Sequence, residues 1–477
     1  MNKKSKFKYL GLTCLMLMFT ACIGPSLVPR KENKTLPSAF AGSMDSTNSA
    51  KTKWKVFFTD QSLIALIDSA LKYNQELNIM MQEINISKNE VKARKGQYLP
   101  FGNIGAGAGV EKVGRYTSQG ANDANTDIMP GKKFPDPLPN CGLGANITWE
   151  VDIWKKLRNS KNVAIAKYLS TVEGKNFMVT HLISEIANAY YELMALDNQL
   201  EILKQNIDIQ KNALEMVKLE KISTRVTELA VRKFEAEVLK NQSRQYYIIQ
   251  QITVTENRIN FLVGRFPQPV VRNSSGFTDL IPDTIYAGIP SQLLQNRPDI
   301  RQAELDLTAA KLDVKVARAN FYPSFIINAG LGYQAFNPSF LIQTPQSLIY
   351  NLAGDLMAPL INRNAIKANY YSANSKQLQA VYNFERTILS AHIEVVNQLS
   401  NIGNLKKSYD LKSKQVEALT QSIDISTVLF KSARADYMEV LLTQRDALES
   451  KFELVETKKL QMNALINLYR ALGGGWN

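Results

Sequence analysis

The sequence predicts an α+β fold that is mostly α and that contains two copies of one long repeat. Three observations predict it: a repeat that spans most of the chain, short runs of alternating polarity, and two long stretches almost free of Gly and Pro. With 21% charged and 45% hydrophobic residues, the 477-residue chain has the composition of a folded protein. Each half is expected to run from a helix through a strand pair into two very long helices.

The repeat is visible in matching segments. Residues 74–77 and the Tyr-Leu-Pro at 98–100 align with residues 297–300 and the Phe-Tyr-Pro at 321–323 at an offset of 223. Residues 227–231 align with 436–440 at an offset of 209, and residues 262–264 align with 472–474 at an offset of 210. A longer loop in the first copy, residues 118–140, explains the drop. The predicted organisation is a first repeat at 61–263, a proline-rich equatorial linker at 264–292 outside the helical wall, a second repeat at 293–473 and a tail at 474–477.

Four strands are predicted, at about 101–116, 141–154, 323–336 and 347–359. In the second of them every odd position from Leu143 to Ile153 is apolar, and every even position is small or polar. This period of two places one face against apolar material and the other against water or small groups. The strands have the length of tilted membrane-crossing strands, although a soluble sandwich hairpin would share the pattern. Four strands leave exposed edges, so several chains pooling strands into one closed barrel is the favoured arrangement.

Very long helices follow each strand pair. Residues 175–263 contain no Gly or Pro, and residues 360–472 contain only Gly403. Apolar residues in both stretches step by three, four and seven, as in coiled coils. A helix of 60 to 70 residues would be roughly 90 to 105 Å long. Each stretch must reverse once, and residues 223–227 and 432–436 are the expected turns, with Thr227 and Asp436 as N-caps.

The N-terminus predicts an exported, lipid-anchored chain. A basic head and an apolar run of about 11 residues end at Ala21, just before Cys22, which resembles a bacterial lipoprotein signal. Residues 1–21 are therefore expected to be a signal peptide, Cys22 the lipidated residue and residues 22–60 a lipid-anchored segment. An ordinary secretory signal with a chance cysteine is the alternative. Once the signal and its Cys14 are removed, Cys141 is the one thiol besides Cys22, so no intramolecular disulfide is expected.

Several classes of function are disfavoured by what the sequence lacks. The net charge of +14 accompanies interleaved Glu and Asp, which favours solvated helix faces over a nucleic-acid site. The two histidines, His181 and His392, lie far from any cysteine, and no metal-ligand spacing occurs. Neither a phosphate-binding loop nor a nucleophile with its base stands out. We therefore expect no enzyme activity and no cofactor, with energy supplied by partner proteins.

Taken together, these segments resemble the outer membrane efflux protein family of the TolC and OprM type, in its NodT-type lipoprotein subgroup. The resemblance covers nearly the whole mature chain. It is carried by both helix-to-strand junctions, at 98–100 and 321–323, and by residues 149–154, 294–304 and 436–441. The most specific of these is the Arg-Pro-Asp-Ile run that starts at Arg297.

The resemblance implies a homotrimer in the outer membrane. Each chain would give four strands to a twelve-stranded transmembrane barrel and its helices to a long periplasmic tube, which meets a periplasmic adaptor and an inner-membrane transporter. The implied function is a passive exit duct for small toxic compounds such as drugs. A duct for type I protein secretion has the same fold and stays open. A periplasmic adaptor or a coiled-coil scaffold is a different class, and the whole-chain repeat and paired strands disfavour both.

The resemblance also implies a channel tip at the two helix reversals. In the family the second tip commonly carries a Gly, an Arg and two Asp spaced by three, and the matching positions here are Ala433, Ala435, Glu439 and Leu442. A ring of three Glu439 carboxylates would attract cations, but a solvated helix-face residue is an equal alternative. The candidate tip residues are Thr227, Glu228, Arg434, Asp436 and Glu439. Trp149 and Trp154 are either interface aromatics at the lower barrel rim or simple packing residues.

Overall fold

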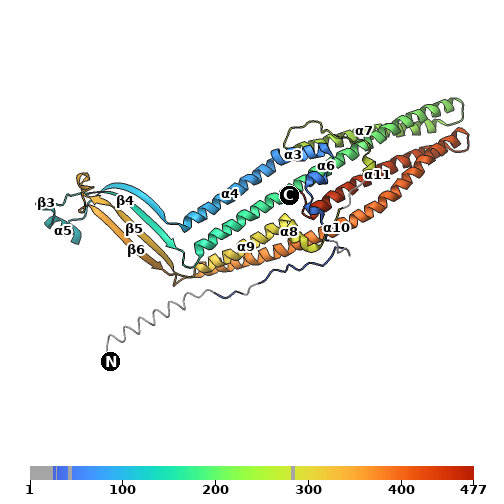
Figure 1. Ribbon diagram of the computed structural model, residues 1–477. Helices are drawn as coiled ribbons and strands as arrows, with labels where there is room; N and C mark the ends of the chain where they lie inside the picture. Colours follow the sequence, from blue (N-terminus) through green and yellow to red (C-terminus); the bar gives the residue numbers. More distant parts are fainter. Residues whose placement is uncertain (1–24, 28–29, 41–45, 281–284, 477) are drawn as a thin grey trace. The chain divides into compact units, whose positions relative to one another are not determined.

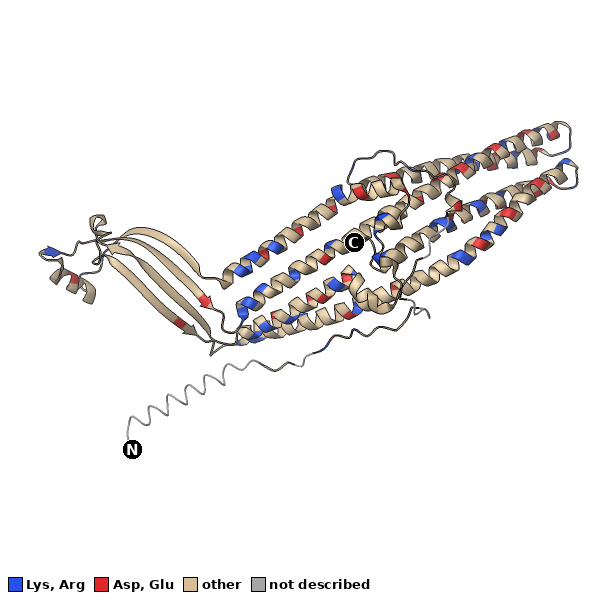
Figure 2. Cartoon of the chain, viewed as in Figure 1, with Lys and Arg blue, Asp and Glu red and all other residues tan. Residues whose placement is uncertain are grey.

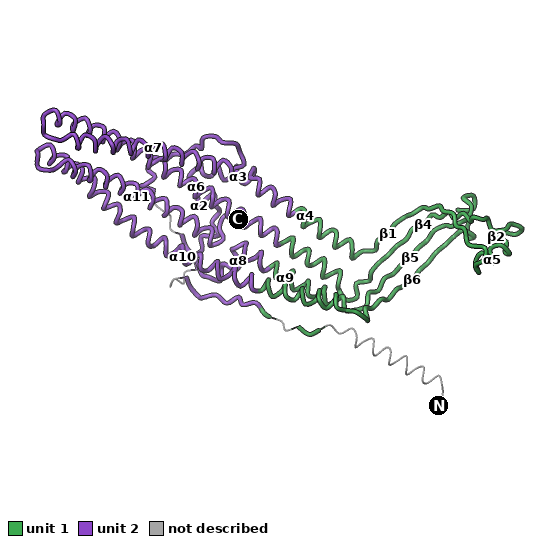
Figure 3. The backbone as a smooth tube through the Cα atoms, turned by 180° about the vertical axis from the view of Figure 1, so that it is seen from behind, with its two compact units in different colours: residues 1–31, 85–169, 305–381 green, residues 32–84, 170–304, 382–477 purple. Residues whose placement is uncertain are grey.

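The computed structural model describes residues 25–27, 30–40, 46–280 and 285–476 (Figure 1). The expected signal peptide and Cys22 lie outside the described residues. The chain divides into two compact units, the first made of residues 1–31, 85–169 and 305–381 and the second of residues 32–84, 170–304 and 382–477 (Figure 3). Each of the two units therefore contains segments from both halves of the sequence repeat.

The first unit contains one four-stranded antiparallel sheet. Its strands are β1 (Phe101–Glu111), β4 (Leu138–Val151), β5 (Ser324–Ala335) and β6 (Leu348–Met357), in the order β1-β4-β5-β6. The first-half pair and the second-half pair join through β4 and β5, where Val151 lies opposite Phe325. Three strands lie within their predicted ranges, and β4 begins and ends three residues earlier than predicted. In the described residues β1 and β6 have one partner strand each, so both outer edges of the sheet are unpaired.

The longer loop of the first copy is folded. It carries a short helix, α5 (Ser118–Asn125), and a small hairpin of β2 (Asp127–Met129) and β3 (Lys132–Lys133). A side chain at Gly120 would collide with the Gly114 carbonyl, so this glycine allows the helix to approach the preceding turn. Composition alone predicts only an irregular loop here, because the helix depends on that approach.

Helices adjoin the sheet at one end only. α4 (Gln75–Tyr98) leads into β1 and α9 (Pro298–Ala319) leads into β5, while α6 (Lys156–Ile222) and α10 (Asn364–Lys431) begin shortly after β4 and β6. Since neighbouring strands are antiparallel, all four helix–strand junctions lie at the same end of the sheet. The order of elements is the helix, strand pair and long helices that the sequence predicts for each half.

The second unit contains both helical hairpins. α6 and α10 have 67 and 68 residues, and α7 (Glu228–Val263) and α11 (Tyr437–Ala471) return alongside them. At 1.5 Å per residue each long helix is about 100 Å long. The apolar residues of α6 that step by three, four and seven are buried at Leu193, Leu203 and Val217. The corresponding residues of α10 beyond Val395 are half-buried.

The core of the second unit lies where the hairpins meet the N-terminal segment and the linker. The short helices α2 (Trp54–Phe57) and α3 (Gln61–Tyr73) pack on α6, α7 and α11. Tyr190 of α6 donates a hydrogen bond to Asp60 Oδ2 at 2.7 Å, and Tyr469 of α11 donates one to the Thr52 carbonyl at 2.6 Å. Burial, followed by the Asp60 hydrogen bond, raises the pKa of Tyr190. Two tyrosine hydroxyls therefore fasten the N-terminal segment to the helices.

The linker also belongs to this core. It contains the turns η2 (Phe277–Asp279) and η3 (Pro290–Gln292) and leads into α8 (Leu293–Asn296). Phe277 is fully buried, and Lys458 of α11 donates a hydrogen bond to the Leu280 carbonyl at 2.8 Å. Burial lowers the pKa of this lysine. The expectation of a linker merely outside the helical wall is thus incomplete, because its Phe277 side chain fills part of the core.

In each half, the end of the last helix contacts the residues just before the helix that leads into the first strand, and we call this contact the joint of that half. The two joints are equivalent in position but use different residues. Asn74 donates a hydrogen bond to the Leu262 carbonyl, and Arg297 donates one to the Ala471 carbonyl. A Cβ on Gly264 would collide with the carbonyl of residue 73, and one on Gly473 with that of residue 296. The equivalent residues are thus 209 apart at the C-terminal ends. The offset of 210 read from the sequence is one residue too long, because it matched glycines by type rather than by position.

Candidate functional site

Both helical hairpins end in the same five-residue turn. α6 ends at Ile222 and α7 begins at Glu228, while α10 ends at Lys431 and α11 begins at Tyr437. In the first turn the Arg225 amide donates to the Glu220 carbonyl at 3.0 Å, and in the second the Arg434 amide donates to the Leu429 carbonyl at 2.9 Å. This six-to-one bond closes a helix with a Schellman motif. The reversals therefore lie at the predicted residues.

Each turn depends on one residue in the left-handed region. Thr224 has φ +62° and Ala433 has φ +53°, a conformation that glycine adopts at least cost. The family pattern carries a glycine at the second position, and this chain forms the same helix ending with an alanine. The missing glycine therefore leaves the backbone of the turn intact.

The charges of the first tip are satisfied within the chain. Glu228 forms ion pairs with Lys221 and with Arg232, the latter at 2.8 Å. The hydrogen bond from Lys221 is the main cause that lowers the pKa of Glu228. Thr227 occupies the N-cap position of α7, but its side chain makes no capping hydrogen bond, contrary to the expectation. Local pairing thus neutralises the carboxylate at this tip.

The second tip keeps exposed charges. Arg434, Asp436 and Glu439 are all exposed, and Asp436 occupies the N-cap position of α11 without a side-chain capping bond. The Glu439 amide donates to the Asp436 carbonyl at 3.0 Å. Within the described part of the chain, the Glu439 carboxylate has no ion pair. The structure therefore brings Asp436 and Glu439 together on one helix start and leaves the Glu439 charge available.

The two hairpins contact each other below their tips. Leu441 of α11 packs with Leu214, Phe234 and other apolar residues of the first hairpin. Arg244 of α7 pairs with Glu449 of α11 at 2.6 Å, and its guanidinium lies 4.2 Å from the centre of the Phe452 ring. Apolar packing and one bridging ion pair therefore hold the hairpins side by side.

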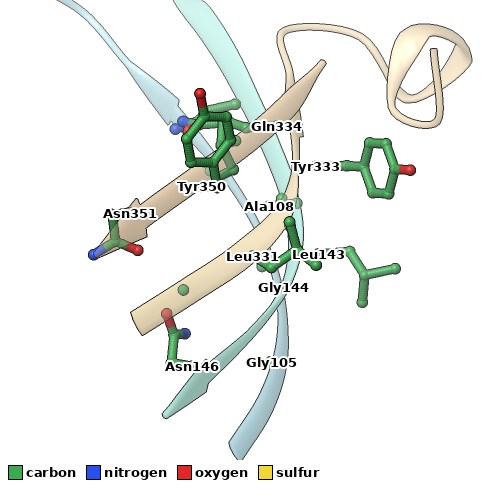
Figure 4. A pocket seen from close by; sticks show the side chains of 17 residues that line it. Gly105, Ala108, Leu143, Gly144, Asn146, Leu331, Tyr333, Gln334, Tyr350 and Asn351 are labelled. Carbon is green, nitrogen blue, oxygen red and sulfur yellow. The ribbon is translucent and has the colours of Figure 1, made fainter. Parts of the chain in front are cut away.

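The sheet has two chemically different faces. Residues opposite each other in register share a face, so Asn146, Gly330 and Asn351 lie together on one side. In Figure 4 the side chains of Asn146 and Asn351 project to one side, and those of Leu143 and Tyr333 to the other. Part of the sheet borders a hollow of about 570 Å³ that glycines and amide side chains help to line.

Hydrogen bonds run across the polar face. Thr148 donates to Asn328 Oδ1 at 3.0 Å, and Asn328 Nδ2 donates to Asp355 Oδ2 at 2.9 Å. The four strands of this sheet contain no Lys or Arg, and all of their acidic residues lie on this face: Glu111, Glu150 and Asp355. The opposite face carries Leu, Ile, Phe and aromatic residues. This alternation is that of a sheet with apolar surroundings on one side and water on the other.

Aromatic residues mark the junction end of the sheet. Trp154 stacks on Tyr322, with ring centres 4.7 Å apart, and its indole nitrogen donates to the Pro323 carbonyl at 2.8 Å. Trp149 donates to the Tyr98 carbonyl at 3.3 Å. Both tryptophans therefore pack against the junctions, yet Trp154 remains 46% exposed. The packing alternative explains their contacts, and the exposure of Trp154 leaves the interface alternative open.

Two structural roles were missed by sequence reasoning. Asp152, buried between β4 and α6, accepts hydrogen bonds from the amides of Leu157 and Arg158, both at 2.9 Å. Arg297 is 7% exposed and binds Asp299, Glu394 and the Ala471 carbonyl. Burial opposes its charge, but its carboxylate partners outweigh burial and raise the pKa of the guanidinium. The position of an acid just before a helix could have indicated the role of Asp152. The role of Arg297 could not be predicted locally, because its partners lie 97 and 174 positions away in the sequence.

No cluster of metal-binding side chains occurs among the residues described in the structure. His181 lies 3.8 Å from Glu185, and His392 stacks on the buried Phe40 with ring centres 5.3 Å apart. In the same part of the chain, no helix is both long enough and apolar enough to cross a membrane. The two histidines therefore have ordinary packing surroundings.

Comparison with known proteins assigns the chain to a family. A family model described as outer membrane efflux protein matches residues 66–265 and 289–474. The chain is 26% identical over 473 residues to the pyoverdine export outer membrane protein OpmQ of Pseudomonas aeruginosa, covering 98% of this chain and 97% of that protein. It is 24% identical over 472 residues to the cation efflux system protein CusC of Escherichia coli K12, covering 97% and 98%.

Solved structures share the fold. A crystal structure of CusC superposes with a TM-score of 0.81 at 22% identity, covering 95% of this chain and all of that one. A membrane protein from Pseudomonas aeruginosa superposes with a TM-score of 0.84 at 20% identity, covering 94% and 100%. Helices, strand pairs and hairpins thus recur in the same arrangement along the chain. The chain belongs to the outer membrane efflux protein family and is located in the outer membrane.

Proposed function

We propose that the chain is the outer-membrane exit duct of a tripartite efflux pump, passing small toxic compounds such as drugs without chemical change. The observation that carries the proposal is the two-faced sheet with two unpaired edges, continuous with helices about 100 Å long. An apolar outer face suits lipid, and a polar inner face suits a water-filled passage. A periplasmic adaptor and an inner-membrane transporter would deliver the solute and the energy.

The proposed assembly is a homotrimer. In lipid, the open edges of β1 and β6 would leave backbone groups without partners, which costs several kcal/mol per group. Pairing β6 of one copy with β1 of the next removes both edges, and three copies give the twelve-stranded barrel that the family resemblance implies. Exposed apolar residues on α7, among them Leu239, Tyr246 and Phe261, support further burial between copies.

Small solutes are favoured over secreted proteins. OpmQ is named for pyoverdine export, CusC for cation efflux, and a 26% identical relative, SrpC of Pseudomonas putida, for solvent efflux. These names concern compounds far smaller than a protein. The adaptor and scaffold classes no longer fit, because the family match spans both halves of the chain.

Particle shape and mass in detergent test the assembly. Electron microscopy with light scattering should find a threefold cylinder roughly 130 to 140 Å long, the sum of helix and bilayer lengths. Its protein mass should equal three mature chains, each lighter than the 53.5 kDa of the full sequence by the signal peptide. A monomer, or a rod without a barrel of bilayer height, would overturn the proposed duct.

We propose that Glu439 forms a carboxylate ring at the closed tip, with Thr227, Glu228, Arg434 and Asp436 in the surrounding tip surface. A unit charge at 4 Å in water contributes about 1 kcal/mol, so Glu439→Gln should reduce the cation-to-anion permeability ratio by a few-fold. Glu417→Gln, at an exposed site on the shaft of α10, is the matched control. Reversal potentials in planar bilayers measure the ratio, and an unchanged ratio would remove Glu439 from the tip.

We propose that Cys22 carries the lipid anchor. Cys22→Ala should abolish incorporation of radioactive palmitate, because the thiol is the acylated group of a bacterial lipoprotein signal. Cys141→Ala should leave the label unchanged, since that residue belongs to β4. Labelled Cys22→Ala protein would defeat the assignment.

A further inference from the structure

Basic residues gather where the helices adjoin the sheet. The helical segments 85–98, 155–169, 305–319 and 363–381 of the first unit contain fifteen basic residues and three acidic ones. Figure 2 shows Lys and Arg concentrated on these helix ends. The helix segments beside the sheet therefore carry a strong excess of positive charge.

The shafts of the two helical hairpins carry balanced charge. Segments 170–222, 228–263, 382–431 and 437–471 contain twenty-one basic and twenty-two acidic residues. The mature chain's positive charge is thus mainly a local property of the junction segments. Interleaved charges describe the shafts correctly but not the helix ends, and a charge count in windows along the sequence would have separated the two.

The basic residues lie close to the end of the sheet. With a rise of 1.5 Å per residue, Lys95 and Lys92 are about 5 and 9 Å from the end of α4, Lys315 about 6 Å from the end of α9, and Lys367 about 5 Å from the start of α10. A bilayer's headgroup layer is about 5 to 8 Å thick on each side, and the Debye length is about 8 Å. These lysines therefore lie within reach of charges located at the rim of the strands.

Much of this charge has no counter-charge in the chain. Arg94, Lys156 and Arg158 pair with Glu90, Glu150 and Asp152, respectively. Lys92, Lys95, Lys315 and Lys367 are exposed and have no ion pair among the described residues. Crowded like charges repel one another unless an external anion compensates them. Because these lysines lie on separate helix ends, a negatively charged surface would compensate them better than one small anion.

The adjoining strand surface indicates where that negative surface lies. Trp149, Phe325 and Leu356 end the apolar face of the sheet at the junctions. The exposed ring of Trp154 lies on Tyr322 beside them. Aromatic residues between an apolar band and a basic zone are typical of the boundary between hydrocarbon and headgroups.

We propose that the sheet-side ends of α4, α9 and α10, through Lys92, Lys95, Lys315 and Lys367, bind the headgroups of anionic phospholipids in the leaflet next to the junctions. The proposal rests on the proposed function, since it requires the sheet to lie in the membrane. The lipid contact would fix the depth of the sheet in the bilayer, because moving it either way separates lysines from phosphates. Recognition is by charge, so it weakens as salt screens it.

Brominated lipids test the contact, because they quench the fluorescence of tryptophans that touch lipid. The full chain is reconstituted in vesicles of phosphatidylcholine with 30% phosphatidylglycerol, with bromine on one lipid or the other. Quenching of Trp149 and Trp154 should show a several-fold preference for phosphatidylglycerol at 50 mM salt that falls towards one at 0.5 M. The combined change Lys92→Gln, Lys95→Gln, Lys315→Gln and Lys367→Gln should abolish the preference.

A matched variant separates position from total charge. Lys204→Gln, Lys240→Gln, Lys414→Gln and Lys431→Gln remove four exposed lysines from the shafts and should keep the preference. Equal quenching by both lipids in the parent, or a preference that survives the junction variant, would overturn the lipid contact. If the junction variant instead changes ion permeability without any lipid preference, the lysines line the passage. No quenching by either lipid, together with no conductance, would count against the proposed duct itself.

Discussion

Replacing Arg297 by alanine should lower the free energy of unfolding by about 3 kcal/mol, because it removes a buried cation from two half-buried carboxylates, Asp299 and Glu394. Arg297 Nη1 lies 2.8 Å from Glu394 and 2.7 Å from the Ala471 carbonyl, and Nη2 lies 2.8 Å from Asp299. Without the guanidinium, Asp299 loses its charged partner and the end of α11 loses a hydrogen bond. Guanidinium unfolding of the detergent-solubilised protein, followed by circular dichroism, measures the change.

The control for Arg297→Ala is an exposed ion pair. Lys218→Ala breaks the pair with Glu215 on α6, where both side chains are about half exposed or more, and should cost less than about 1 kcal/mol. A midpoint for Arg297→Ala no lower than that of Lys218→Ala would show that the buried network contributes no net stability.

Substituting alanine for either joint glycine should destabilise the protein by about 2 to 4 kcal/mol. Gly264 has φ +80° and Gly473 has φ +91°, and the left-handed conformation alone costs alanine about 1 to 2 kcal/mol. The remainder comes from the new Cβ, which would collide with the carbonyl of residue 73 or 296. Because the two sites are equivalent, the two variants should lose similar amounts of stability.

A third glycine supplies the opposite expectation. Gly403 lies inside α10, and a Cβ there would meet no atom within 4 Å. Gly403→Ala should therefore stabilise the chain by about 0.5 to 1 kcal/mol through helix propensity. Unfolding midpoints of the three variants, measured together, check both signs. A stabilised Gly264→Ala or Gly473→Ala variant would refute the close approach at the joints.

Local sequence patterns were sufficient to predict the elements of this fold. Alternation located the strands, the absence of Gly and Pro located the long helices, and the residue types Thr227 and Asp436 indicated the reversals. Details set by distant partners could not be predicted in this way. Thr227 and Asp436 take the N-cap positions without capping bonds, because Schellman bonds of the preceding helices already define the turns.

The candidate tip was only partly predictable. The sequence singled out Glu439 as the possible carboxylate ring and included Glu228 among the other candidate tip residues. The structure separates them, because Lys221 and Arg232 surround Glu228 whereas Glu439 keeps a free carboxylate among the described residues. Lys221 belongs to the other arm of the hairpin, so the pairing depends on how the chain reverses.

The two joints differ in chemistry, so the two halves of the chain should differ in their sensitivity to the loss of a charge. Asn74 closes the first joint with a neutral amide, and Arg297 closes the second with a buried guanidinium and two half-buried carboxylates. Replacing a carboxylate by its amide, as in Glu394→Gln, removes a charge from the second joint and leaves the first unchanged. Such a substitution should therefore loosen the α10–α11 hairpin and not the α6–α7 hairpin. In the proposed threefold assembly, the three α10–α11 hairpins would then respond to the loss of this charge, and the three α6–α7 hairpins of similar shape would not.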